Sequence, residues 1–172
     1  MTTPRIIIIG FMAAGKTTVA RALARRLNDS VIDLDESITK REGRTPQELI
    51  DEVGEAAFRE AETRALRDAL RYGTARIIAL GGGAWTIERN RALVAQHDCV
   101  TIWLDAPFEL CWQRIKSDQS VRPLARDAAA ARARYDERRS YYQLARHHIS
   151  AAQNVDEIVA EILMRLEQAK AS

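Results

Sequence analysis

The chain has few of the residues and patterns that mark a secreted or membrane-bound protein. Only two cysteines, Cys99 and Cys111, occur among its 172 residues, and their spacing fits neither a disulfide framework nor a metal-ligand motif. The apolar run Ile6–Ile9 is much shorter than a signal-peptide core or a membrane span. We therefore expect a reduced, cytoplasmic protein with no membrane partner.

An excess of charge of one sign is also missing. The 26 basic and 24 acidic side chains nearly cancel and leave a formal net charge of +2. This balance provides no general field to draw the chain onto nucleic acid, so recognition has to depend on local charge. Lysine itself is scarce, because the only lysines are Lys16, Lys40, Lys116 and Lys170. A lysine within a turn, such as Lys16, is therefore a candidate functional residue.

The apolar pattern predicts one α/β domain over residues 1–172. At 47% hydrophobic the chain can bury a full-sized core, and no linker or internal repeat divides it. Short β-rich runs alternate with helical periodicity. The expected strands are Ile6–Ile9, Val31–Ile32, Ile77–Leu80 and Val100–Leu104. The polar stretch Ser117–Arg126, which lies between two helical segments, suits a mobile lid.

Capping residues indicate where some of the helices begin. Thr45 is placed to cap a helix whose first position is Pro46 and whose Glu48 can return a bond to the cap. Asn154 and Glu157 mark the start of the last helix in the same way.

A phosphate-binding loop of the Walker A type follows the first predicted strand. Its residues, Gly10-x4-Gly15-Lys16-Thr17, stand between an apolar strand and the head of a helix, as the mechanism of such a loop requires. Backbone N–H groups and the helix dipole then attract phosphate oxygens. Lys16 can reach the β- and γ-phosphates, and the Thr17 hydroxyl can ligate Mg²⁺. ATP and Mg²⁺ are the expected ligands, and an ordinary strand-to-helix turn is the alternative.

A pair of aspartates follows the second predicted strand in "VIDLDES". Alternation along an extended chain would place Asp33 and Asp35 on one side. One carboxylate could then serve the magnesium shell, and the other could face an acceptor hydroxyl. Two solvated aspartates that open a helix at Glu36 would give the same sequence, so both interpretations remain open.

Three further motifs bear on the acceptor of the phosphate. Arg59 and Glu62 in "GEAAFREAE" lie three apart on one helical face, which also suits a surface ion pair. The triple glycine Gly81–Gly83 follows a strand directly, as expected where a ligand touches the backbone. Arg122 in "SVRPLARD" lies within the predicted lid, where it could close over the transferring phosphate.

Together these motifs resemble the shikimate kinases, small enzymes of the nucleoside monophosphate kinase-like P-loop fold. The resemblance runs from Ile6 to about Leu166 through GxxxxGKT, "DLD", "GRT…GEAAFREAE", "GGG", "VRPL" and a late arginine before Tyr142. It implies a three-layer sandwich with a central parallel sheet, and a lid at about residues 117–126. It further implies ATP-dependent phosphorylation of the 3-hydroxyl of shikimate, a step of chorismate and aromatic amino-acid biosynthesis, by a cytoplasmic monomer.

The resemblance implies a role for each residue on the nucleotide side. Thr17 and Asp33 would hold Mg²⁺, with Asp33 in the outer shell of the metal. Lys16 and Arg122 would act on the transferring phosphate. The nucleotide-binding residues would be Gly10, Ala13, Ala14, Gly15, Lys16, Thr17, Thr18 and Arg114, of which Arg114 packs against adenine.

The acceptor side is implied in the same way. Asp35 would bind the hydroxyls of shikimate and act as the base at the 3-hydroxyl. Arg59 and Arg138 would bind the shikimate carboxylate, with Glu62 steadying the arginine. Backbone contacts to the substrate would come from Gly81, Gly82 and Gly83.

The chain departs from the usual pattern of the family at several positions. Ala13 stands where glycine is usual, Ala125 where leucine is usual, and "SAAQNVDE" lacks the proline that opens the adenine-contacting loop.

The family's arginine-x-Pro-Leu-Tyr reads "RRSYY" with Ser140 in place of proline, which makes both arginines candidates. The spacing to Tyr142 selects Arg138 over Arg139.

Two other functions share part of these motifs. Another small-molecule hydroxyl kinase of the same fold, acting on gluconate or a nucleoside monophosphate, would keep the loop but change Asp35, Arg59 and the triple glycine. A non-catalytic nucleotide-binding module would keep the loop without needing Asp35. The combination of Arg59, the glycines and Arg122 therefore favours shikimate.

Overall fold

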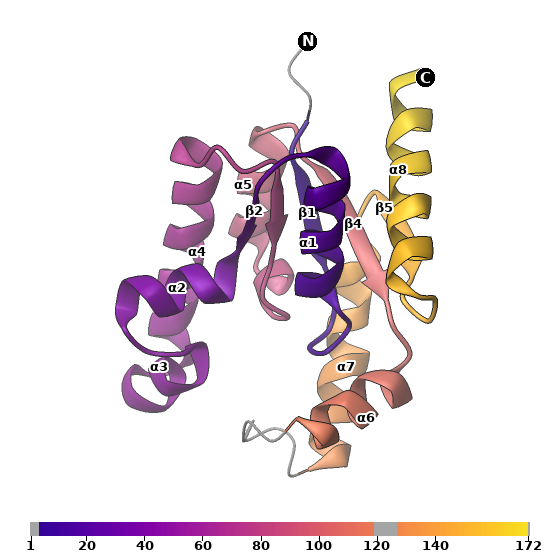
Figure 1. The fold of residues 1–172 in the computed structure, drawn as a ribbon. Helices are drawn as coiled ribbons and strands as arrows, with labels where there is room; N and C mark the ends of the chain where they lie inside the picture. Colours follow the sequence, from indigo (N-terminus) through magenta and orange to yellow (C-terminus); the bar gives the residue numbers. More distant parts are fainter. Residues whose placement is uncertain (1–3, 119–126, 172) are drawn as a thin grey trace.

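A five-stranded sheet forms the centre of the fold in a computed structural model of the chain, which describes residues 4–118 and 127–171 (Figure 1). The order of strands is β2-β3-β1-β4-β5, and each neighbouring pair runs parallel. The strands are β1 (Ile6–Ile9), β2 (Val31–Asp33), β3 (Ile77–Ala79), β4 (Val100–Asp105) and β5 (His147–Ser150).

Helices cover both faces of the sheet. Helices α1 and α8 lie side by side in front of it in Figure 1, and α5 and α7 lie behind it. This layering confirms the predicted α/β sandwich with a central parallel sheet. The helices are α1 (Lys16–Leu27), α2 (Leu34–Glu42), α3 (Pro46–Val53), α4 (Glu55–Tyr72), the 3-10 turn η1 (Ala84–Thr86), α5 (Glu88–Gln96), α6 (Phe108–Ser117), α7 (Ala128–Tyr142) and α8 (Val155–Ala171).

The apolar run at the start of the chain is the central strand β1. All of its isoleucines are buried, because helices cover both faces of a parallel strand at this position. Ile6 pairs with Ile77 of β3 on one side and with Val100 of β4 on the other. The phosphate loop therefore begins at the carboxyl edge of the sheet, between two buried strands.

Two helix starts agree with the capping residues. Thr45 and Glu48 form a reciprocal capping box, with Pro46 in the first helical position of α3. At the last helix, Asn154 N–H donates to Glu157 at 3.1 Å, and Glu157 N–H donates to the Asn154 side chain at 3.0 Å. Both predictions are confirmed.

Strand β5 was not predicted from the sequence. Of its four residues only Ile149 is buried, so the segment lacks the apolar alternation that marks a strand. It forms because it pairs with β4, where Leu104 lies opposite Ile149. The formation of an edge strand of this kind depends on pairing with the neighbouring strand more than on the strand's own residues.

Most of the predicted lid lies outside the described residues. Helix α6 ends at Ser117, and Asp127 caps α7 by accepting bonds from the N–H groups of Ala129 and Ala130. Arg122 and Ala125 fall between these points, so the lid and its arginine stay predictions. No helix in residues 4–118 and 127–171 has the length and apolar content needed to cross a membrane.

Candidate active site

The phosphate loop turns sharply into helix α1. Gly15 caps the helix with a φ of 95°, a left-handed conformation that costs glycine little. Ala13 also has a positive φ, 59°, at the position where the shikimate kinases usually have glycine. Two left-handed residues close together curl the backbone, so that N–H groups at the head of α1 can face an anion.

Lys16 lies at the first position of α1. Its Nζ donates to the carbonyl of Phe11 at 2.8 Å, which folds the side chain back over the loop. Burial lowers the pKa of Lys16 from 10.5 to about 8, while the nearby Asp35 and Asp33 carboxylates and the Cys111 thiol oppose that shift. Burial thus disfavours the charge of Lys16, and the two aspartates partly offset that cost.

Thr17 and Asp33 bring oxygen atoms together beside Lys16. The Thr17 hydroxyl donates to Oδ2 of Asp33 at 2.5 Å, and the other oxygen of Asp33 accepts the N–H of Glu36 at 3.1 Å. A hydroxyl and a carboxylate are the hard ligands that Mg²⁺ prefers, and Mg²⁺ at phosphates takes only one or two protein ligands. These two residues therefore fit the metal role expected of them.

Asp35 does not reach the site by strand alternation, and that part of the sequence argument is wrong. Strand β2 ends at Asp33, which caps α2, and Asp35 lies in the first turn of that helix. Aspartate is strongly favoured at a helix cap and in the first turn, and here this preference ended the strand. The helical turn nevertheless leaves both carboxylates near Lys16.

Each glycine of the triple glycine lies against a different predicted acceptor residue. A Cβ atom built on Gly81 would lie 2.7 Å from Oδ1 of Asp35, and one on Gly82 would lie 3.2 Å from Nη1 of Arg138. A Cβ atom on Gly83 would overlap the guanidinium of Arg59, at 2.8 Å from its Cζ. The backbone turn and three charged side chains thus converge, and the absence of side chains on the turn makes this approach possible.

Arg59 is held by Glu62 on the same helix. Its Nη1 donates to Oε1 of Glu62 at 2.8 Å, as the three-residue spacing predicts. Glu62 is only 1% exposed, and its Oε2 has no hydrogen-bond partner among the described residues. Burial raises the pKa of Glu62, and the charge of Arg59 opposes that shift. The ion pair fixes the direction in which Arg59 points.

Arg138 and Tyr142 approach the same turn from helix α7. The Tyr142 hydroxyl donates to the carbonyl of Gly82 at 2.5 Å, and it also bonds to the Arg138 side chain. Arg138 is 9% exposed, and burial lowers its pKa. In the sequence, Tyr142 served only to select Arg138 over Arg139 by its spacing. Its bond to the glycine turn is therefore a contact that sequence reasoning missed.

Comparison with known proteins identifies the family. The family model described as shikimate kinase matches residues 12–167. A shikimate kinase of Salinibacter ruber is 38% identical over 92% of this chain and 82% of the relative. The solved structure of shikimate kinase from Acinetobacter baumannii, in complex with shikimate, is 31% identical and aligns with a TM-score of 0.90, covering 99% of this chain and 97% of the other. The chain belongs to the shikimate kinase family.

A gluconokinase from Sinorhizobium meliloti also resembles the chain in structure. It aligns with a TM-score of 0.61 over 97% of this chain and 93% of the other, at 16% identity. At this identity the likeness shows the fold alone.

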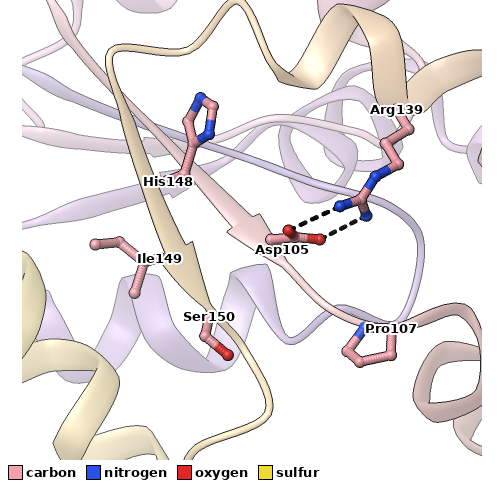
Figure 2. Close-up of a pocket in the computed structure, with 6 residues that line it drawn as sticks. All are labelled: Asp105, Pro107, Arg139, His148, Ile149 and Ser150. Carbon is pink, nitrogen blue, oxygen red and sulfur yellow. Dashed lines mark hydrogen bonds and ion pairs between the residues drawn. The ribbon is translucent and has the colours of Figure 1, made fainter.

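The side chain of Arg139 reaches different partners from that of Arg138. Figure 2 shows its guanidinium facing Asp105, with bonds of 2.8 and 3.1 Å to the two carboxylate oxygens. Its Nη1 also bonds to the Tyr135 hydroxyl at 2.9 Å, and its Cζ lies 4.9 Å from the Trp103 ring. Arg139 also lines a pocket of about 420 Å³, together with Asp105, Pro107, His148, Ile149 and Ser150.

Arg114 lies beside the phosphate loop. Its Nη1 donates to the carbonyl of Ala13 at 3.0 Å, and a Cβ atom on Gly15 would lie 3.7 Å from the same nitrogen. The remaining predicted nucleotide residues, Gly10, Ala14 and Thr18, belong to the loop and the first turn of α1. The side chain predicted to pack on adenine is thus next to the predicted phosphate site.

Proposed function

We propose that this chain transfers the γ-phosphoryl group of ATP to the 3-hydroxyl of shikimate. The observation that best supports this proposal is the convergence of Asp35, Arg59 and Arg138 on the glycine turn. Two guanidiniums suit a carboxylate, and an aspartate suits a hydroxyl. This arrangement fits an anionic polyhydroxy acid.

The nucleotide side would act through positioning and positive charge. Phosphoryl transfer proceeds through a loose transition state that needs alignment and charge stabilisation more than covalent catalysis. Loop N–H groups would hold the phosphates, and Lys16 would attract the charge between the β- and γ-phosphates. When bound, Mg²⁺ neutralises phosphate charge, and Thr17 and Asp33 are the residues that would hold it. Arg122, outside the described residues, would add charge from the lid.

The acceptor side would orient one hydroxyl. Arg59 and Arg138 would bind the carboxylate, and backbone groups of Gly81–Gly83 would contact the ring substituents. Asp35 would then accept the proton of the 3-hydroxyl. The hydroxyl oxygen would form a bond to the γ-phosphorus, and the bond between the γ-phosphorus and the ADP oxygen would break. The products are shikimate 3-phosphate and ADP.

We further propose that the protein works in the cytoplasm as a monomer, without nucleic acid or membrane partners. The two free cysteines and the nearly balanced charge support this proposal. Light scattering of the purified chain with ATP and shikimate tests the monomer, and a concentration-dependent dimer would contradict it.

The function is tested by a coupled assay with ATP, Mg²⁺ and a panel of hydroxy acids that includes shikimate, quinate and gluconate. We expect turnover with shikimate and a product phosphorylated at the 3-position, identified by phosphorus and proton NMR. Asp35→Asn serves as the control, because it keeps the shape of the side chain but removes the base. Preference for gluconate, or ATP binding without turnover of any acid, would overturn the assignment.

A further inference from the structure

A buried polar pair connects helix α4, which carries Arg59, to the 3-10 turn η1, which follows the triple glycine. Thr63 on α4 is 1% exposed and Asn90 on α5 is 0% exposed. The Thr63 hydroxyl donates to Oδ1 of Asn90 at 2.8 Å, and Nδ2 of Asn90 donates to the carbonyl of Ala84 at 2.9 Å. Two hydrogen bonds therefore run from α4 through α5 to the 3-10 turn η1.

Both ends of this connection are next to the site. Thr63 directly follows Glu62, the partner of Arg59, and Ala84 directly follows Gly83, against which Arg59 lies. A shift of α4 along the glycine turn would change the position of Arg59 relative to Gly83. The same shift would break the bonds made by Asn90.

The directions of the two bonds are set from outside the pair. Arg89 donates from Nε to the Thr63 hydroxyl at 3.1 Å, so that hydroxyl accepts one bond and has its proton left to give to Asn90. Asn90 must then present Oδ1 to Thr63 and Nδ2 to Ala84. Arg89 is tied in turn to Glu60 of α4 by an ion pair of 2.6 Å.

Apolar packing would fill the same space without fixing this geometry. A hydrogen bond loses strength steeply when its angle or length changes, whereas apolar contacts tolerate sliding. Binding sites need their groups held to within about 0.5 Å, which directional bonds between buried groups provide. The buried polar pair therefore suits a positional role.

We propose that Thr63 and Asn90 are positioning residues that hold Arg59 and the glycine turn in the mutual placement that acceptor binding requires. This inference rests on the proposed function. Among the described residues, the side-chain hydrogen bonds of Thr63 and Asn90 lead to Arg89 and Ala84 and not to the phosphate loop. We therefore expect the loss of the pair to weaken acceptor binding more than ATP binding.

The test is steady-state kinetics of Thr63→Val, which keeps the shape of the side chain and removes the bond to Asn90. We expect the KM for shikimate to rise about three- to tenfold and the KM for ATP to stay within about twofold. Thr63→Ser, which keeps the hydroxyl, should restore a shikimate KM near that of wild type.

The matched control is Thr101→Val. Thr101 is another buried threonine, 8% exposed on β4, and its hydroxyl accepts the N–H of Arg146 at 2.9 Å. This variant should lower the melting temperature without changing the shikimate KM. If Thr63→Val behaves in the same way, with a wild-type KM, the pair only supports the fold and the proposal is overturned.

Two further measurements make the outcome decisive. If Thr63→Val does not fold, Thr63→Ala, which removes the same bond to Asn90 with a smaller side chain, takes its place; an unchanged shikimate KM in that variant overturns the proposal. Wild-type turnover of shikimate is measured alongside. A wild type that leaves shikimate unphosphorylated overturns both the function and the positioning role, whereas an active wild type with an equal KM in the variants overturns only the second.

Discussion

Arg138 and Arg139 are neighbours on helix α7, but their side chains contact different residues. Arg138 lies against Gly82 and bonds to Tyr142, whereas Arg139 forms a two-bond ion pair with Asp105 and stacks on Trp103. Successive residues of a helix point about 100° apart, so only one of the two can face the glycine turn. This geometry supports Arg138 as the acceptor residue and makes Arg139 a natural control.

Arg138→Ala should weaken shikimate binding, and Arg139→Ala should not. Hydrogen bonds to a charged group contribute about 1.5–3 kcal/mol, so we expect Arg138→Ala to raise the shikimate KM roughly ten- to a hundredfold. Arg139→Ala loses a half-exposed ion pair and a cation–π contact, together about 1 kcal/mol, which should lower the melting temperature by about 2–4 °C. Kinetics and thermal unfolding of both variants test this. A larger KM effect from Arg139 would reverse the assignment.

Lys16→Ala should remove turnover and leave the fold intact. Loss of one preorganised positive group at developing charge commonly lowers kcat about 10²- to 10³-fold. The change also relieves the cost of burying a charge, so thermal stability should not fall. The kcat and the melting temperature are measured together. Wild-type turnover in a folded variant would exclude the proposed role of Lys16.

The lowered pKa of Lys16 predicts how ATP binding depends on pH. The free enzyme holds this lysine half-charged at about pH 8, and phosphates at the loop favour the charged form. ATP binding near pH 8.5 should therefore take up a proton, and affinity should fall as pH rises through 8. Calorimetry in buffers of different ionisation enthalpy measures the uptake. The Lys16→Ala variant should show none, and equal uptake in both proteins would contradict the prediction.

Much of the site was predictable because its signals are local. The phosphate loop has a fixed spacing, and the triple glycine directly follows a strand, where charged side chains approach the backbone. The pairs Thr63–Asn90 and Asp105–Arg139 have no such signal, because their partners are 27 and 34 residues apart and meet only through the fold. Asp35 shows a conflict between two local rules, in which the helix cap at Asp33 prevailed over strand alternation.

Ala13→Gly should leave stability unchanged or raise it. Ala13 adopts a φ of 59°, and the left-handed conformation costs a residue with a Cβ atom about 1–2 kcal/mol. Glycine avoids this cost but adds about 0.4–1 kcal/mol of unfolded-state entropy, so the two terms nearly balance. Ala22→Gly, inside helix α1, should instead lose about 1 kcal/mol. Chemical denaturation of both variants decides, and equal destabilisation would show that Ala13 is not strained.

The carboxylate of shikimate should be recognised by Arg59 and Arg138 together. Both guanidiniums lie against the glycine turn. The carboxylate that they would bind is not the reacting group, so their bonds should persist from the bound state to the transition state. An Arg59→Ala variant should therefore show a higher shikimate KM with little change in ATP binding.

A neutral amide of shikimate separates this effect from damage to the fold. For the wild-type enzyme, the KM for the amide should be roughly ten- to a hundredfold higher than the KM for shikimate, because the charge-assisted bonds are lost while the protein is unchanged. The amide should add little further loss in Arg59→Ala, because two changes that remove one interaction are not additive. In Arg139→Ala, the amide should raise the KM by the same factor as in the wild-type enzyme, since Arg139 bonds to Asp105 and not to the substrate. Additive losses in Arg59→Ala and Arg138→Ala would show that these arginines bind something other than the carboxylate, even if shikimate is still phosphorylated.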